Sequence, residues 1–107
     1  MVNTVRKGSY FERKAKQILE RQGFVVEKAK RTRFQGTDFY GLFDLICVDG
    51  KTIKFVQVAD CVKPKEWFAR AERFQVPLNC SKELWIYRER KGFRVILIPS
   101  KKVKAIG

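Results

Sequence analysis

The sequence predicts an α/β fold in one domain, with a mixed central β-sheet flanked by helices. Three observations predict it. Apolar residues recur at helical spacing near the N-terminus, Asp49-Gly50 joins two β-branched and aromatic runs, and a second helical segment precedes two more strand-like runs. A chain of 107 residues is long enough for one hydrophobic core. We therefore expect residues 1–107 to form a single domain, with residues 1–7 as a basic N-terminal arm.

The first helix is expected over residues 9–22. Its apolar positions follow one helical face, at Phe11, Ala15, Ile18 and Leu19. Ser9 is the expected N-cap, with Glu12 as its partner in a capping box, and Gly23 is expected to end the helix. The opposite face is strongly cationic through Arg13, Lys14, Lys16 and Arg21.

A strand is expected over residues 24–29, followed by a basic loop over residues 32–41 and then a hairpin. A two-residue loop at Asp49-Gly50 would place Asp44 opposite Phe55. Because side chains alternate along a strand, Asp44, Phe55, Gln57 and Ala59 would share one side of the sheet. The second hairpin strand, residues 53–60, is apolar on both sides and should be central in the sheet.

In this register Asp44 and Gln57 are diagonal neighbours, so their oxygens could hold a hard cation such as Mg²⁺. The alternative is structural: Asp44 caps a strand end and Gln57 is an ordinary buried amide. Asp38, in the preceding loop, is better explained as a turn residue than as a further ligand.

The remainder of the chain predicts one helix and two strands. The helix begins at Lys63-Pro64 and is stopped by Pro77, and its apolar stripe comprises Trp67, Phe68, Ala71 and Phe74. Strands follow over residues 83–88 and 93–98, with a turn at Lys91-Gly92.

The charge of the chain predicts a polyanionic partner. It carries 24 Lys and Arg against 11 Asp and Glu, a net charge of +13. Nucleic acid is favoured over an anionic membrane, since no apolar-faced basic helix stands out. We find no apolar run long enough to span a membrane and no signal peptide at the N-terminus.

The chain has no histidine, which excludes Ser-His and Cys-His nucleophile pairs and His-based metal nucleases. Cys47, Cys61 and Cys80 show no CxxC spacing, so a structural zinc site and a disulfide framework are disfavoured. A reducing, cytoplasmic location is expected, and a single Cys61–Cys80 bridge stays open. Any catalysis must rest on carboxylates, amines and a metal.

The order of these features resembles the PD-(D/E)XK nuclease superfamily, and within it the archaeal-type Holliday junction resolvases. The matching stretches are residues 7–13 (KGSYFER), 23–24 (GF), 43–46 (FDLI) and 56–58 (VQV). The resemblance implies a restriction-endonuclease-like core of order αβββαβ. It also implies that Glu12, Asp44, Gln57 and the Val58 carbonyl bind Mg²⁺, for which Mn²⁺ can substitute.

The chain departs from the family at position 59, where alanine stands in place of the catalytic lysine. A methyl group can neither orient a water nor neutralise a phosphoryl oxygen. Three explanations stay open: engineered inactivation, a degenerate nuclease kept for binding, or a lysine supplied from elsewhere. Lys54 is a poor substitute because it points to the opposite side of the sheet, and Lys63 could reach back only if the chain bends.

The resemblance thus implies a Mg²⁺-dependent, structure-selective DNA endonuclease impaired by Ala59, acting as a homodimer on branched DNA such as four-way junctions. The residues expected to contact phosphates are Arg6, Lys7, Arg13, Lys30, Arg31 and Arg33. The alternatives are a non-catalytic nucleic-acid-binding module on the same fold and, less favoured, a small RNA-associated basic protein with purely structural carboxylates.

Overall fold

The computed structural model describes residues 4–29, 42–88 and 90–99. In chain order the elements are α1 (Thr4–Arg21), β1 (Val25–Lys28), β2 (Leu45–Val48), β3 (Ile53–Ala59), α2 (Lys65–Arg73), β4 (Cys80–Arg88) and β5 (Gly92–Leu97). The predicted order of helix, strand, hairpin, helix, strand, strand is confirmed. The loop expected over residues 32–41, including Asp38, lies outside the described residues.

The described strands form one sheet with the order β1-β2-β3-β4-β5. The pairs β1–β2, β2–β3 and β4–β5 are antiparallel, whereas β3–β4 is parallel. A parallel pair needs a crossover connection, and α2 supplies it between β3 and β4. The sheet is therefore mixed, and β3 is its central strand, as its apolar sequence predicts.

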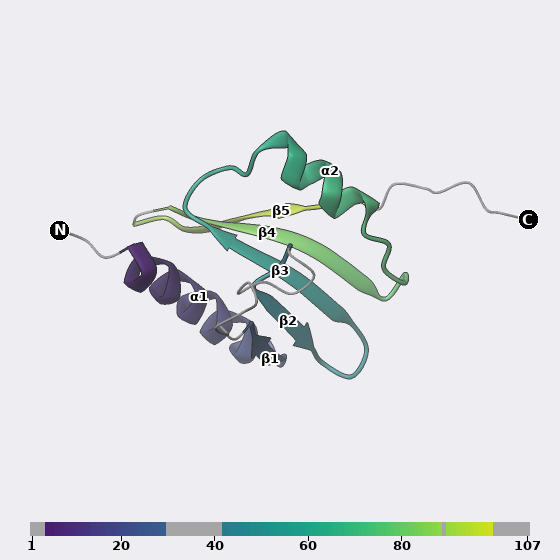
Figure 1. The fold of residues 1–107 in the computed structure, drawn as a ribbon. Coiled ribbons are helices and arrows are strands. Elements are labelled where there is room, and N and C mark those ends of the chain that lie inside the picture. Colours follow the sequence, from purple (N-terminus) through teal and green to yellow (C-terminus); the bar gives the residue numbers. More distant parts are fainter. Residues whose placement is uncertain (1–3, 30–41, 89, 100–107) are drawn as a thin grey trace, which may run out of the picture.

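The helices lie on opposite sides of the sheet, with α1 on one face and α2 on the other (Figure 1). Under α1 the core includes Phe11, Leu19, Val56, Val58 and Trp85. Under α2 it includes Leu42, Phe43, Trp67, Ala71 and Leu84. Successive residues of β3 alternate between these two clusters, which is why this strand is apolar on both sides. No helix in the described parts of the chain is long and apolar enough to cross a membrane.

Helix α1 ends as predicted but begins earlier than predicted. At its C-terminus Gly23 has φ +99°, the N–H of Phe24 donates to the Leu19 carbonyl at 3.1 Å, and the Gly23 N–H donates to Glu20 at 3.0 Å. The N-terminal prediction is wrong. The helix begins at Thr4, so Ser9 is a helical residue rather than an N-cap, and the arm of residues 1–7 is partly helical. The segment packed through Phe11 provides a nucleus from which a helix propagates cooperatively toward the N-terminus.

The β2–β3 hairpin has a longer loop than predicted. Val48 pairs with Ile53, so residues 49–52 form a four-residue loop. The Asp49 carboxylate accepts hydrogen bonds from the backbone N–H groups of Lys51 (2.9 Å) and Thr52 (2.7 Å), which stabilises this longer turn. The register therefore shifts by two residues relative to the prediction. A shift of two residues keeps the paired side chains of β2 and β3 on their predicted faces.

The C-terminal half differs from the predictions at element ends. Pro64 is the N-cap of α2 rather than part of its first turn, and the helix ends at Arg73, before Pro77. Strand β4 begins at Cys80, three residues before the predicted start at Glu83, because its parallel pairing with β3 already starts at Ile53. The sequence pattern did not reveal this start, because the first residues of β4 include buried polar side chains. The Lys82 ammonium, for example, caps the end of α2 by donating to the carbonyls of Ala71 (2.6 Å) and Phe74 (2.7 Å).

All three cysteines are free thiols in the structure. Cys80 pairs with Ile53 at the start of β3, whereas Cys61 follows the end of the same strand. At about 3.3 Å per residue, β3 separates their backbones by more than about 20 Å. A disulfide requires Cα atoms within about 7 Å, so the Cys61–Cys80 bridge that the sequence left open does not form.

Candidate functional site

Asp44, Gln57 and Val58 lie together where β2 begins and the second half of β3 runs beside it. The N–H of Asp44 donates to the carbonyl of Val56 at 2.8 Å, although Val56 is the pairing partner of Leu45, so the regular ladder ends at Leu45. One carboxylate oxygen of Asp44 accepts the N–H of Val58 at 3.0 Å. The Gln57 amide donates to the Val58 carbonyl at 3.4 Å. Phe43 packs under α2 whereas Leu45 packs under α1, so side-chain alternation breaks at Asp44. The predicted diagonal arrangement of Asp44 and Gln57 is replaced by contacts that both side chains make with Val58.

Burial fixes this group in place. Asp44 is 6% exposed and Gln57 is 8% exposed. A buried carboxylate needs compensating donors, and the Val58 N–H is one of them. The structural explanation from the sequence also holds here, because Asp44 does cap the β3 backbone at the strand end. Capping and cation binding are compatible, since a carboxylate has two oxygens and about four acceptor positions.

Glu12 reaches the same end of the sheet from α1. Its carboxylate forms an ion pair with Lys28 of β1, with Nζ and Oε2 3.1 Å apart. The next residue along, Ala29, donates its N–H to the Asp44 carbonyl at 2.9 Å. Glu12 is therefore linked through the end of β1 to the start of β2. The Lys28 ammonium neutralises the carboxylate that the resemblance assigns to a metal.

Lys28 is a residue of the site that sequence reasoning missed. Helix α1 and strand β1 pack together along one face of the sheet, which brings Lys28 to Glu12. The sequence contained a weak signal that Lys28 faces α1. Lys28 and the buried Val26 are two residues apart on one strand, so both side chains face α1.

Ala59 lies at the end of β3, partly buried, and packs against the apolar cluster under α2. It is two residues beyond Gln57 on the same strand, so both lie on one side, as predicted. Lys63 follows in the segment between β3 and α2, at the same end of the strand.

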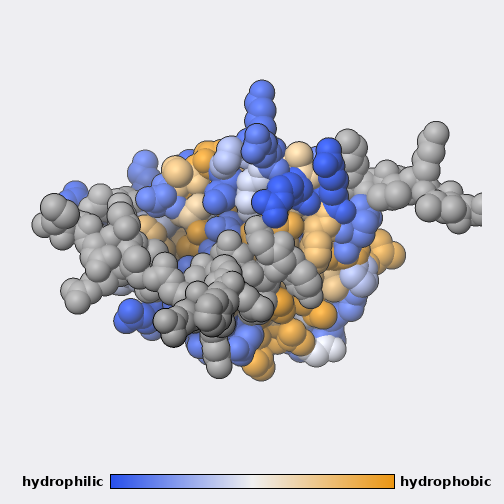
Figure 2. Space-filling model, viewed as in Figure 1, coloured by the Kyte–Doolittle hydropathy of each residue, from blue (hydrophilic) through white to orange (hydrophobic). Residues whose placement is uncertain are grey.

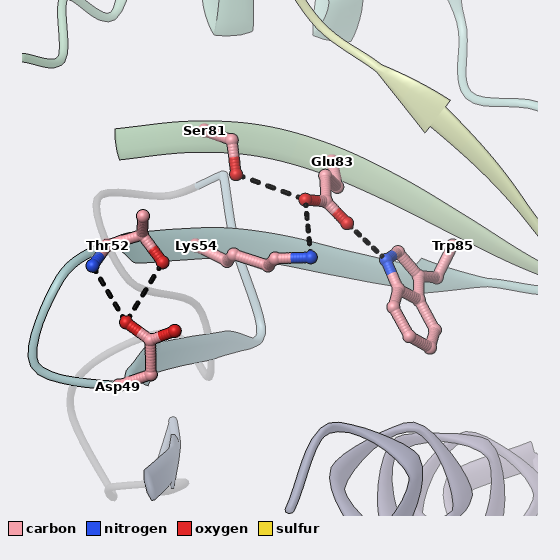
Figure 3. A network of polar contacts seen from close by, with 6 residues as sticks. All are labelled: Asp49, Thr52, Lys54, Ser81, Glu83 and Trp85. Atoms are coloured by element: carbon pink, nitrogen blue, oxygen red, sulfur yellow. Dashed lines mark hydrogen bonds and ion pairs between the residues drawn. The ribbon is translucent and has the colours of Figure 1, made fainter. Parts of the chain in front are cut away.

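The Lys54 side chain lies on the opposite side of the sheet from Gln57, as the alternation of side chains along β3 predicts. Its ammonium lies 3.3 Å from the Glu83 carboxylate and 5.1 Å from the centre of the Phe24 ring, which belongs to the cluster under α1. Glu83 also accepts hydrogen bonds from Ser81 (3.0 Å) and from the indole N–H of Trp85 (2.9 Å). Figure 3 shows Lys54, Ser81 and Trp85 converging on this carboxylate. Lys54 is thus a structural residue on the α1 face of the sheet.

The oxygen atoms near Asp44 are of the chemical types that bind a hard cation. A carboxylate, an amide oxygen and a backbone carbonyl are all ligands of Mg²⁺. Gln57 would have to turn its amide oxygen toward the ion, because its nitrogen faces the Val58 carbonyl. No group of three or more His, Cys, Asp or Glu residues that could hold a metal occurs among the described residues. Asp44 would therefore supply most of the charge here unless Glu12 leaves Lys28.

Of the residues expected to contact phosphates, Arg13 is exposed on α1. The side chains of Arg6 and Lys7, and residues 30, 31 and 33, lie outside the described part of the chain. Charged groups also cover the outer surface of α2, where Lys65, Arg70 and Arg73 are exposed. Figure 2 shows hydrophilic side chains projecting from this side of the molecule.

The architecture belongs to the class of α/β folds in which a mixed sheet carries the first helix on one face and a β-α-β crossover helix on the other. No family model matches the chain, and no curated protein matches it at a significant level. Among solved structures, the chain is similar to Hjc from Archaeoglobus fulgidus, described as a Holliday junction resolvase from an archaeal hyperthermophile.

The similarity to Hjc has a TM-score of 0.65 at 15% sequence identity, and it covers 86% of this chain and 73% of that chain. The predicted resolvase-like fold is thereby confirmed. At this identity the similarity concerns the fold, so the roles of Glu12, Asp44, Gln57, Val58 and Ala59 remain predictions.

Proposed function

We propose that this chain is a DNA-binding protein of the Holliday junction resolvase type, whose Mg²⁺-dependent, structure-selective endonuclease site is impaired by Ala59. One observation carries the proposal. Within a resolvase-like fold, Asp44 accepts the Val58 N–H and Gln57 donates to the Val58 carbonyl, at the end of the sheet that Glu12 also reaches. The net charge of +13 supports a polyanionic partner.

The chemistry follows from the donor set. A bound Mg²⁺ would polarise the scissile phosphate and lower the pKa of an attacking water. Asp44, Gln57 and the Val58 carbonyl would hold the ion, with Glu12 as a fourth ligand once it separates from Lys28. The hydrogen bond from Val58 keeps the Asp44 carboxylate in position before substrate arrives. The group that orients the water is missing at Ala59, so hydrolysis should be slow.

The proposed ligand is branched DNA, and the proposed assembly is a homodimer. A four-way junction has two-fold symmetry, so two copies of one site related by the same symmetry can act on opposing strands. Cationic side chains such as Arg13 would contact phosphates and recognise shape rather than base sequence. Mn²⁺ is expected to substitute for Mg²⁺.

The surroundings of Ala59 and of Glu12 favour a second function. Ala59 packs against the apolar cluster under α2, and the Glu12 carboxylate is already neutralised by Lys28. Both features suit a non-catalytic module that binds branched nucleic acid on the same fold.

The deciding experiment compares the chain with Ala59→Lys on a synthetic four-way junction with Mg²⁺. We expect tight junction binding by both proteins, weakening as salt is raised, and efficient cutting by Ala59→Lys only. Ala69→Lys is the matched control, because it makes the same substitution on α2, a different element. Asp44→Asn in the Ala59→Lys background should abolish cutting.

The possible results separate the two functions. Junction binding without cutting by either protein would favour the non-catalytic module. If neither protein prefers a junction over linear duplex DNA, the resolvase-type assignment is wrong, although the fold is unaffected.

A further inference from the structure

Tyr10, Lys14 and Tyr87 form a cluster of two aromatic rings and one cation that the proposed metal site does not use. The Lys14 ammonium lies 4.8 Å from the centre of the Tyr10 ring and 5.5 Å from that of Tyr87. Tyr10 and Lys14 are one turn apart on α1, and Tyr87 comes from β4. We call this set the tyrosine cluster.

One ring of the tyrosine cluster is fixed by the core and the other faces solvent. Tyr87 stacks on Phe11, with ring centres 4.3 Å apart and planes 24° apart, and Phe11 is buried. Tyr87 also meets Phe93 of β5 at 5.4 Å. Tyr10, in contrast, is 46% exposed although it is a large ring. An exposed ring beside a rigid aromatic support is the geometry of a stacking platform.

The surroundings of the cluster are cationic. A hydrogen bond with the Tyr10 side chain raises the pKa of Lys14 against a smaller opposing effect of desolvation, and a lysine amine is already charged at neutral pH without this shift. Arg13 lies beside Lys14 on α1 and is exposed, and Arg88 follows Tyr87 and is also exposed. An aromatic ring among cations attracts a ligand with both a flat π-system and negative charge, which is the composition of a nucleotide.

The cluster lies at the same end of the sheet as the candidate metal site. Ala59 pairs with Ile86 across the parallel β3–β4 ladder, and Tyr87 is the next residue of β4. Figure 1 shows the N-terminal half of α1 beside the end of β4 and the start of β5. The tyrosine cluster lies on the α1 face of the sheet and Ala59 on the α2 face, so DNA that passes around this end of the sheet would contact both.

We propose that the tyrosine cluster binds an unpaired nucleotide of branched DNA, with the base stacked on Tyr10 and a phosphate paired with Lys14. This inference rests on the proposed function for the nature of its ligand. It adds a second contact that distinguishes DNA with unstacked bases from regular duplex. The ring requirement is specific: phenylalanine can replace Tyr10, whereas an aliphatic residue cannot.

The test uses a DNA flap in which the unpaired nucleotide next to the duplex is 2-aminopurine, whose fluorescence is quenched when it stacks. Tyr10→Leu removes the ring and keeps an apolar, helix-compatible side chain, and Tyr10→Phe is the matched control. Relative to linear duplex, the affinity of Tyr10→Leu for the flap should fall about tenfold, as expected for one lost base–aromatic stack. Tyr10→Phe should stay within about twofold of the unmodified chain.

The fluorescence separates a stacking role from a structural one. Quenching by the unmodified chain and by Tyr10→Phe, but not by Tyr10→Leu, supports the proposal, provided that the variants unfold at the same urea concentration. Equal flap preference and equal quenching in all three proteins would overturn it and leave the proposed function intact. Failure of the unmodified chain to bind any branched DNA would instead overturn the proposed function. Tighter binding to an RNA of the same sequence would overturn the choice of DNA.

Discussion

The backbone N–H of Val58 donates to the Asp44 carboxylate at 3.0 Å, across the end of the β2–β3 hairpin. A side chain here takes the place of a strand partner, because β2 begins only at Leu45. The contact orients a buried carboxylate toward the strand that carries Gln57 and the Val58 carbonyl. A single hydrogen bond thus joins the stability of the hairpin to the geometry of the candidate metal site.

Gln57→Glu should strengthen metal binding. The substitution adds a second buried carboxylate beside Val58, which Asp44 also contacts, and affinity for hard cations rises with the charge of the ligand set. We expect Mg²⁺ and Mn²⁺ to bind about tenfold more tightly, a gain of about 1.4 kcal/mol, in a calorimetric titration. Without metal the variant should be less stable, because two buried carboxylates repel each other. Asp44→Asn should reduce metal binding, and equal affinity in all three proteins would place the metal elsewhere.

Lys28→Gln should release Glu12. The ion pair is partly exposed, with side-chain exposures of 37% for Lys28 and 24% for Glu12. Its loss should lower the free energy of unfolding by less than about 1 kcal/mol. Metal affinity should rise, because the Glu12 carboxylate no longer has to separate from an ammonium group. Arg13→Gln removes the same charge from a neighbouring exposed position and is the control. Identical metal titrations for the two variants would show that Glu12 is not a ligand.

Lys54→Met should destabilise the fold without affecting the chemistry. It leaves the Glu83 carboxylate, whose side chain is 4% exposed, without its cationic partner. Breaking a buried pair in this way typically costs about 3–5 kcal/mol, and the 26% exposure of the Lys54 side chain places this case at the lower end. Urea unfolding should show the loss, and adding Glu83→Gln should recover part of it. If Ala59→Lys cuts junctions, it should do so equally with Lys54→Met, whereas a specific loss of cutting would make Lys54 catalytic.

Cys47 should make stability depend on alkaline pH. Burial, with a contribution from Glu83 that Lys54 opposes, raises the pKa of Cys47 from its ordinary 9.0 to about 12. Between these values the unfolded thiol loses its proton while the folded thiol retains it. The folded state then binds more protons, so stability falls as pH rises, by up to about 1.4 kcal/mol per pH unit.

The measurement for Cys47 is a pair of urea titrations at about pH 8 and pH 10.5, which bracket the ordinary thiol pKa. Cys47→Ala should lose less stability over this interval than the unmodified chain, because the alanine has no proton to release. The exposed Cys61 provides the control, and Cys61→Ala should behave like the unmodified chain. Alkylation at pH 8 should accordingly modify Cys61 and spare Cys47. Equal pH dependence in Cys47→Ala and the unmodified chain would contradict the assignment.

The sequence by itself determined the types and order of the elements, because helical and strand periodicities are local. It also determined that Gln57 and Ala59 share one side of the sheet, whereas the irregular backbone at Asp44 could not be predicted from it. The four-residue loop moved the register by two positions, and an even shift leaves strand parity unchanged. Burial of Phe11 and Leu19 under α1 was likewise readable from their spacing.

The tertiary structure alone decided which side chains meet across distant segments. Glu12 pairs with Lys28, Lys54 with Glu83, and Tyr10 shares a cation with Tyr87, through contacts between different elements. Such contacts depend on the order of the strands in the sheet and on which face each helix covers. The spacing of apolar residues along the sequence indicates neither of these. The start of α1 also could not be predicted from the spacing of its apolar residues. A helix that is held by its packed residues extends past the last residue of its apolar face.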